Sequence, residues 1–278
     1  MTSPFQQVEA FSALHRQSEV LLLPNAWDLG SALLLAGAGF AALATTSGGL
    51  AASLGRPDYS VTAVESLAHA TTICKAVGVP VTADLENGFA DDPAGVADTV
   101  RAAVEAGLAG CSIEDATQDP AKPIYEFAAA VERVAAAAQA AHGDGSLFTL
   151  TARAENELSG VHDLRNTIRR LQAYEEAGAD VVYAPGLSRI DDIKRLVNSV
   201  HVPVNVLMVP GGPTVRELEA VGVRRISVGS TFAFLAYGAM LNAAQELLRG
   251  AEVTWWAPAR LARKRGKSCF RRQESEGS

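Results

Sequence analysis

A regular alternation of short apolar runs and longer amphipathic stretches restricts the fold of this chain more than any other feature. Eight runs of four to six residues each lead into a polar or glycine-containing turn. A segment with apolar residues three and four positions apart then follows. The eight runs are residues 20–24, 41–45, 81–84, 110–114, 148–153, 181–184, 204–207 and 225–228. Strands that alternate with helices of this length pair in parallel through right-handed crossovers.

Eight such units favour a closed barrel over an open, doubly wound sheet. Helical stretches ending near Gly107 and Gly178 place glycine where the chain needs positive φ to enter the next strand. No G-x-G-x-x-G or Walker-type loop follows any run, which weakens the open-sheet alternative. The 278 residues suit one barrel, which typically takes about 250 residues. We predict an α/β fold: a single (β/α)₈ TIM barrel over residues 1–250, with a C-terminal helical extension.

The last 28 residues, 251–278, differ in composition from the rest of the chain. They contain a Trp pair and a basic run, and seven Lys/Arg against three Glu give them a net charge of +4. Since the whole chain carries −7, the remaining residues carry −11. An acidic body argues against nucleic acid as the main partner. We predict a basic tail outside the barrel, either flexible or used in contacts between subunits.

Cysteine usage and the apolar runs indicate the compartment. The three cysteines are widely spaced, which predicts neither a disulfide framework nor a metal knuckle and fits a reducing compartment. The first residues lack the basic and apolar regions of a signal peptide. The apolar runs are broken by glycine and too short for a membrane span. We expect a cytoplasmic protein without a membrane partner.

Carboxylates gather where a barrel places its active site, at the carboxyl ends of the strands. Asp84 and Glu86 follow the third run, and strand alternation puts both on the face of Thr82. Glu114 ends the fourth run, and Asp58 approaches from a loop. Such carboxylates repel one another unless protons or a cation intervene. Oxygen ligands without His or Cys favour Mg²⁺ or Mn²⁺ over Zn²⁺, with one carboxylate bound directly and the others through water.

Groups that bind anions complete the predicted site. Arg153 ends the fifth run, and an arginine at the barrel mouth suits a bidentate grip on a substrate carboxylate. After the second run, Ser47, Gly48 and Gly49 offer backbone N–H groups and a hydroxyl to a second carboxylate or a phosphonate. Asn205, in the seventh run, adds one hydrogen bond.

Each of these residues also has a purely structural interpretation. An aspartate at a strand end is as often a helix N-cap as a ligand. Arg153 by itself is explained by a salt bridge to Glu155, and Ser47-Gly48-Gly49 by itself is a turn. Cys111 points toward the helices, which favours a packed core thiol over a nucleophile. Convergence on one end of one barrel favours the metal-site interpretation.

Together these segments resemble the isocitrate lyase/phosphoenolpyruvate mutase superfamily over roughly residues 20–249. The matching segments are Pro24-Asn25-Ala26-Trp27-Asp28, Ser47-Gly48, Leu54-Gly55-Arg56-Pro57-Asp58, Asp84-Leu85-Glu86-Asn87-Gly88-Phe89, Ser112-Ile113-Glu114-Asp115 and Thr151-Ala152-Arg153-Ala154-Glu155. The resemblance implies Mg²⁺ bound directly by Asp84 and through water by Glu86, Asp58 and Glu114. It further implies that Arg153 grips a substrate carboxylate. A homotetramer that exchanges C-terminal helices is also implied.

One loop departs from the family pattern. Isocitrate and methylisocitrate lyases carry K-K/R-C-G-H after the fourth strand, whereas residues 116–124 read ATQDPAKPI. Without that cysteine and histidine, neither of those two activities is expected. Lys122, flanked by Pro120 and Pro123, is the candidate counterpart of the loop lysine in the family's mutases and phosphonopyruvate hydrolases. Decarboxylases and substituted-malate lyases of the family also lack the cysteine motif.

The leading hypothesis is a Mg²⁺-dependent lyase that cleaves a C–C bond of a small 2-oxo or 2-hydroxy acid through a stabilised enolate. Tyr183, Glu114 and Lys122 are the candidate proton donors. A second hypothesis is P–C bond chemistry, as a mutase or hydrolase, on a phosphonopyruvate-like substrate. A third, from a different class, is a non-catalytic barrel that binds a metal–oxo acid complex or an assembly partner.

Overall fold

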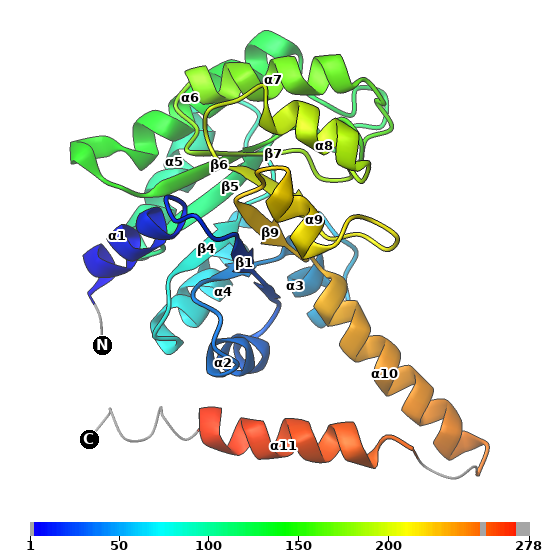
Figure 1. Cartoon of the computed structure of the whole chain (residues 1–278). Coiled ribbons are helices and arrows are strands. Elements are labelled where there is room, and N and C mark those ends of the chain that lie inside the picture. Colours follow the sequence, from blue (N-terminus) through cyan, green and yellow to red (C-terminus); the bar gives the residue numbers. More distant parts are fainter. Residues whose placement is uncertain (1–2, 251–253, 271–278) are drawn as a thin grey trace.

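Among the residues that the structure describes, nine parallel strands form the central sheet in the order β1-β9-β8-β7-β6-β5-β4-β3-β2. The computed structural model describes residues 3–250 and 254–270. The strands are β1 (Leu21–Leu23), β2 (Asn25–Ala26), β3 (Leu43–Thr45), β4 (Val81–Asp84), β5 (Gly110–Glu114), β6 (Thr149–Arg153), β7 (Val181–Tyr183), β8 (Val204–Leu207) and β9 (Arg225–Ser227). Each predicted run contains a strand, so the predicted (β/α)₈ barrel with a C-terminal helical extension is confirmed (Figure 1).

The ninth strand arises because the first predicted run is interrupted at Pro24. The part before this proline, β1, pairs with β9, and the part after it, β2, pairs with β3. Proline has no N–H to donate to a sheet ladder. The Asn25 side chain fastens this seam: its Nδ2 donates to the Thr45 carbonyl at 2.7 Å. Its Oδ1 accepts from the N–H groups of Val228 and Gly229 at 3.0 and 2.8 Å. The barrel is thereby closed between its first and last strands.

Helices surround the barrel, and several have the caps that their sequences predict. They are α1 (Pro4–Leu14), α2 (Leu29–Gly37), α3 (Ser47–Ser53), α4 (Ala63–Ala76), α5 (Pro93–Glu105), α6 (Phe127–Ala141), α7 (Leu164–Glu176), α8 (Ile190–Val197), α9 (Val215–Ala220), α10 (Thr231–Leu248) and α11 (Trp256–Phe270), with a short 3₁₀ turn at Gly143–Gly145. Thr62 and Thr214 each form a capping box with a glutamate three residues later. Gly107 and Gly178 have φ of 82° and 104°, as the turns into β5 and β7 require.

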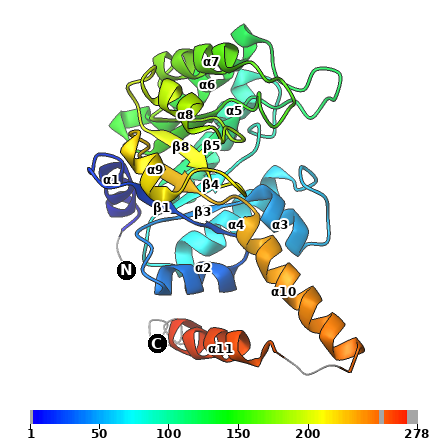
Figure 2. The same ribbon diagram turned by 45° about the vertical axis from the view of Figure 1, so that its right-hand side comes forward.

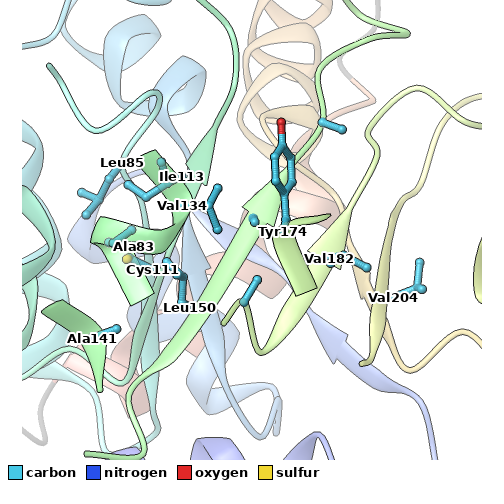
Figure 3. Close-up of a cluster of buried hydrophobic side chains, with 14 of the residues drawn as sticks. Ala83, Leu85, Cys111, Ile113, Val134, Ala141, Leu150, Tyr174, Val182 and Val204 are labelled. Carbon is cyan, nitrogen blue, oxygen red and sulfur yellow. The ribbon is translucent and has the colours of Figure 1, made fainter. Parts of the chain in front are cut away.

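The main hydrophobic core lies between the barrel wall and its helices. Figure 3 shows part of it, with Cys111 and Leu150 from neighbouring strands close to Val134 of α6. Cys111 is fully buried and burial raises the pKa of its thiol, which agrees with the predicted packed core thiol. The outward faces of the strands are therefore covered, and the polar side chains at their carboxyl ends face the barrel mouth.

Helix α1, which was not predicted from the sequence, covers the opposite end of the barrel. Its Phe11 is fully buried, and a Cβ on Gly110, the first residue of β5, would lie 3.1 Å from the Phe11 ring. The residue after the helix, His15, is also buried and stacks edge-on against Phe11. Helix α1 thus seals the amino ends of the strands.

The C-terminal helices extend beyond the barrel. Helix α10 projects from the barrel, and α11 runs back to lie beside α2 (Figures 1 and 2). In that contact the Cys269 sulfur packs directly on Gly37, so a side chain at position 37 would collide with it. The predicted tail forms a helix over its described part, while Glu252, Arg271, Arg272, Glu274 and Glu276 lie outside the described residues. Within residues 3–250 and 254–270, no helix is long and apolar enough to cross a membrane.

Candidate active site

A cavity of about 170 Å³ opens at the carboxyl ends of the strands, where barrels of this type carry their active sites. Residues from every strand, β1 to β9, line it, together with the loops that follow several of them. Among the described residues, its charged lining groups are the carboxylates of Asp58 and Asp84 and the guanidinium groups of Arg153 and Arg225. The pocket therefore brings together acidic and basic groups from distant parts of the sequence.

Asp84 ends β4, and neighbouring segments hold its carboxylate in place. The backbone N–H and the hydroxyl of Ser47 both donate to Oδ2, each at 3.2 Å. The Ser112 hydroxyl donates to Oδ1 at 3.4 Å. The backbone N–H of Asp84 donates to the Thr45 hydroxyl at 2.9 Å. Residues beside β4 on both sides thus orient this carboxylate toward the cavity.

The segment after β3 forms the first turn of α3 and not an open anion-binding loop. Thr46 is the N-cap, and its hydroxyl accepts from the Gly49 N–H at 3.4 Å. Ser47 and Gly48 line the cavity, whereas Gly49 is buried, and a Cβ there would lie 2.5 Å from the Thr46 side chain. A Cβ on Gly48 would lie 2.9 Å from Oδ2 of Asp58. The lack of a side chain at position 48 lets the Asp58 carboxylate enter the mouth, as predicted.

Arg153, at the end of β6, is surrounded by three carboxylates. Its Nη1 lies 3.0 Å from Oδ1 of Asp84, Nη2 lies 2.9 Å from Oε2 of Glu114, and Nε lies 2.8 Å from Oε1 of Glu155. Its guanidinium carbon is 5.3 Å from the centre of the Tyr183 ring. Burial opposes the charge, but the three carboxylates dominate and raise the pKa of Arg153 well above its usual value. Each nitrogen of the guanidinium thus contacts a protein carboxylate in this structure.

Two of those carboxylates lie behind the cavity wall. Glu114 and Glu155 are 3% and 1% exposed, and neither lines the cavity. Burial raises the pKa of both, although Arg153 opposes this effect. The other oxygen of Glu114 accepts from the Tyr59 hydroxyl at 2.8 Å. Tyr59 has a left-handed φ of 61°, a conformation that costs free energy in a non-glycine residue.

Glu86 is close to Asp84, but strand alternation does not place it there. Strand β4 ends at Asp84, and Glu86 has a left-handed φ of 49° in the loop that follows. The prediction that it shares a strand face with Thr82 is therefore wrong in its geometry. Its side chain is 2% exposed, and Oε1 has no hydrogen-bond partner. Burial, followed by the charges of Asp84 and Asp58, raises the pKa of Glu86 to about 8.

The donor set fits a hard divalent cation. Five carboxylates surround the single guanidinium of Arg153, either in contact with it or within its electrostatic reach. They are Asp58, Asp84, Glu86, Glu114 and Glu155. The orphaned Oε1 of Glu86 adds an unused buried acceptor. Among the described residues, no group of three or more acidic, His or Cys side chains is already arranged to hold a metal ion. Mg²⁺ usually keeps several waters and binds few carboxylates directly, so an open set of this kind fits it.

Two more predicted residues line the cavity. The Asn205 Nδ2 donates to the Ser227 hydroxyl at 2.9 Å, and its Oδ1 accepts from Nε of Arg225 at 2.9 Å. Tyr183 lies beneath Arg153, and burial raises the pKa of its phenol to about 12. Both side chains are buried, so a bound molecule that uses them must enter the barrel.

Lys122 lies apart from the cavity in this structure. The loop after β5 folds as a short hairpin, with an antiparallel bridge between Ala116 and Ile124 and a hydrogen bond from the Thr117 N–H to the Pro123 carbonyl at 3.1 Å. Lys122 is exposed at its tip and does not line the cavity. The loop therefore contributes no cation to the site as it stands.

The sequence analysis missed residues that the tertiary structure brings to the site. Asp115 is buried and accepts the Glu155 N–H at 2.7 Å, the Tyr174 hydroxyl at 2.5 Å and an Arg170 N–H at 3.0 Å. This network fixes the chain just after Arg153. Arg225 was also missed, although an arginine at the start of a predicted barrel strand is a signal of a buried charge.

Comparisons with known proteins agree with this geometry. A structure described as a putative lyase/mutase from Burkholderia cenocepacia is 51% identical, with a TM-score of 0.86, and the match covers 88% of this chain and 89% of that one. The 2-methylisocitrate lyase of Escherichia coli is 30% identical over 204 residues, covering 70% of this chain and 68% of its own. An oxaloacetate acetylhydrolase solved with the product oxalate is 26% identical, with a TM-score of 0.85 and full coverage of both chains.

A family profile also matches most of the chain. The profile of phosphoenolpyruvate phosphomutase matches residues 11–248, which includes every strand of the barrel and all the carboxylates around Arg153. The resemblance noted from the sequence segments is therefore confirmed. With its carboxylate-rich mouth on a (β/α)₈ barrel, this chain belongs to the phosphoenolpyruvate phosphomutase family, within the isocitrate lyase/PEP mutase superfamily.

Proposed function

We propose that this chain is a Mg²⁺-dependent lyase that cleaves a C–C bond of a small 2-oxo or 2-hydroxy dicarboxylic acid. One observation carries the proposal: Asp84 is held at the cavity by Ser47, Ser112 and Arg153, with the unpartnered Glu86 close behind it. The relatives support it, since one is a 2-methylisocitrate lyase and another an oxaloacetate acetylhydrolase with bound oxalate.

The metal would be held by Asp84 directly and by Asp58, Glu86 and Glu114 through water. Bound there, Mg²⁺ supplies a Lewis acid beside the oxygen on which negative charge develops as the bond breaks. The four carboxylates and Arg153 keep that position fixed before substrate arrives. Mn²⁺ has the same preference for oxygen ligands and is expected to substitute for Mg²⁺.

The remaining residues would bind and orient the acid. Ser47 and Gly48 face the cavity, with Gly49 supporting their turn, and Asn205 offers an amide deeper in the barrel. Arg153 would hold the substrate carboxylate by sharing its N–H groups with Asp84 and Glu155. Tyr183 is the proposed proton donor to the leaving fragment. A phenol is protonated at neutral pH, and burial raises the pKa of Tyr183 further, to about 12. Glu114 and Lys122 are the other candidates.

We also propose that the active form is a homotetramer. Helix α10 exposes large apolar side chains along its length, which favours their burial by another subunit. Among them are Phe234, Leu235, Met240 and Leu241, each more than half exposed. Sedimentation at micromolar concentration is expected to give a mass near four times 29.1 kDa. A monomer under those conditions would refute the tetramer.

P–C bond chemistry is the second candidate, because the matching family profile is that of a phosphomutase. The same carboxylates and Arg153 would serve a phosphonopyruvate-like substrate. The absence of a loop cation near the cavity, with Lys122 exposed at its hairpin tip, favours the C–C reaction. A phosphonate carries more negative charge than a carboxylate and would require an additional cation.

The experiment is an NMR screen of oxaloacetate, phosphonopyruvate, substituted malates, isocitrate and methylisocitrate, with Mg²⁺ and with chelator. Metal-dependent release of pyruvate or a related oxo acid is the expected result. Asp84→Ala is expected to lower turnover by about 10³-fold or more. Asp98→Ala, at an exposed acid of α5, is the matched control. Release of inorganic phosphate from phosphonopyruvate would select the P–C alternative, and silence of the folded, metal-bound protein would favour a non-catalytic binding barrel.

A further inference from the structure

Arg225 is a buried arginine at the floor of the cavity. It begins β9, is 4% exposed, and lines the same cavity as Asp84 and Arg153. Its Nε donates to Oδ1 of Asn205 at 2.9 Å, and Nη2 donates to the Thr151 hydroxyl at 2.8 Å. Because a guanidinium has five N–H groups in a fixed plane, these bonds orient it firmly without using all its donors.

Neutral groups surround this guanidinium. The third contact of Arg225 is Nη1 with Nε2 of His15 at 3.3 Å. The other ring nitrogen of His15 lies 2.8 Å from the Phe11 carbonyl, so it carries the proton and Nε2 accepts. Burial, and then the charge of Arg225, lowers the pKa of His15 to about 3. Within the described part of the chain, no carboxylate forms an ion pair with Arg225.

An unpaired buried charge is costly, and an anion that enters the cavity would reduce that cost. A buried guanidinium without a counter-ion loses hydration that neutral hydrogen bonds restore only in part. Burial lowers the pKa of Arg225 to about 9, so it stays charged at neutral pH. Three of its five N–H groups have protein acceptors, which leaves two for a ligand.

The position of Arg225 relative to the mouth sets the ligand's length. Arg225 contacts Thr151, and Thr151 precedes Arg153 by two residues on the same strand of the barrel. Two strand residues rise about 7 Å. A molecule with one end at the mouth, beside Asp84 and Arg153, would therefore need its second acidic group one layer of side chains deeper in the barrel to contact Arg225.

We propose that Arg225 binds the inner carboxylate of a four-carbon dicarboxylic acid whose other end lies at the Asp84 and Arg153 level. This inference rests on the proposed function, because it takes the same cavity as the substrate site. It adds the residue that binds the second carboxylate and limits the acid to four carbons. Arg225 and Asn205 form the inner end of the site. The Asn205 Nδ2, which donates to the Ser227 hydroxyl in this structure, is a second donor for the inner carboxylate.

The test compares succinate with succinamate, which has the same length but one charge fewer. Calorimetric titrations with Mg²⁺ at pH 7 are run on the full chain and on Arg225→Gln. The wild-type chain is expected to bind succinate about tenfold or more tightly than succinamate, the value of one charge-assisted hydrogen-bonded pair. Arg225→Gln is expected to bind the two within about threefold of one another. An unchanged preference in that variant would overturn the proposal.

Two further variants make the comparison specific. Arg225→Lys keeps a positive charge at the floor and is expected to retain most of the preference for succinate. Arg224→Gln removes the adjacent arginine, which bonds the Ser18 carbonyl outside the cavity at 2.9 Å, and is expected to behave as wild type. If Arg224→Gln also lost the preference for succinate, that preference would be due to the net charge of the protein, and the role of Arg225 would be overturned.

A structural measurement on the wild-type chain covers the case in which Arg225→Gln does not fold. A crystal structure with succinate and Mg²⁺ is expected to show one carboxylate within hydrogen-bond distance of the Arg225 guanidinium. Both carboxylates at the Arg153 level, or succinate outside the cavity, would overturn the inference. Turnover separates this test from the proposed function. Arg225-dependent binding without turnover would support the inference and contradict the proposed lyase activity. Turnover without Arg225-dependent binding would support the lyase activity and overturn the inference.

Discussion

Two buried arginines, Arg153 at the mouth of the barrel and Arg225 at its floor, differ in the groups that surround their guanidinium charges. Arg153 contacts three carboxylates, and these raise its pKa well above the usual value. Arg225 contacts an amide, a hydroxyl and a neutral imidazole, and burial lowers its pKa to about 9. The mouth thus has an excess of negative charge and the floor an unpaired positive one.

The difference shows what each level of the cavity lacks. The mouth lacks a cation, because several of its carboxylates are buried around one guanidinium and Glu86 keeps an unused oxygen. The floor lacks an anion. A Mg²⁺ ion and a dicarboxylic acid, one end chelated above and the other end at Arg225, would satisfy both levels together. The charge distribution of the cavity is therefore complementary to its proposed ligands.

The largest expected effect distinguishes the two arginines by stability. Arg153→Gln leaves two buried carboxylates, Glu114 and Glu155, and the partly exposed Asp84 without their cation, and is expected to cost about 4 kcal/mol of unfolding free energy. Arg225→Gln loses hydrogen bonds to neutral partners but also removes an unpaired buried charge, so it is expected to cost only about 1 kcal/mol. Urea unfolding of the metal-free protein, compared through midpoints at equal slope, measures both. Equal losses would contradict the contrast between the paired and the unpaired arginine.

A second variant tests whether the cost at Arg153 comes from its carboxylates. Adding Glu155→Gln to Arg153→Gln removes one of the stranded charges and is expected to recover about 2 kcal/mol. In the Arg225→Gln background the same Glu155→Gln change has no stranded charge to remove. A double-mutant cycle in urea is therefore expected to show strong coupling of Glu155 to Arg153 and weak coupling to Arg225. Equal coupling would mean that the two levels are not electrostatically separate.

The smallest expected effect is a pH dependence that belongs to the floor. The pKa of His15 is about 3 when folded, against 6.5 for an unperturbed histidine. The unfolded chain therefore binds a proton below pH 6.5 that the folded chain refuses down to pH 3, and stability falls as the pH falls through that window. The loss from His15 is expected to be about 1 kcal/mol between pH 6.5 and 5.5.

Unfolding free energies of wild type and His15→Gln at those two pH values measure this effect. The variant is expected to lose less stability than wild type over the interval. His162→Gln, at an exposed histidine on the loop after β6, is the control and is expected to match wild type. Equal losses of stability in wild type and His15→Gln between pH 6.5 and 5.5 would mean that His15 is not held neutral beside Arg225.

Much of the site was predictable because the barrel assigns a fixed place to its strand ends. Asp84 and Arg153 end strands, so their convergence followed from the fold alone, and the structure places both at the cavity. Glu86 was predicted for the wrong reason, since a left-handed turn and not strand alternation brings it near Asp84. Tyr59 was not predicted, because its contact with Glu114 depends on the path of a loop.

The sequence by itself determined the (β/α)₈ barrel, its eight strand positions, and the carboxylates and arginine at the mouth, because apolar periodicity and strand ends are local properties of the chain. Only the tertiary structure decided which charges are paired. Arg153 and Arg225 look alike in the sequence, at opposite ends of two short strands. Whether a buried guanidinium meets carboxylates or neutral groups depends on residues from several distant segments, and that pairing exists only once the barrel has closed.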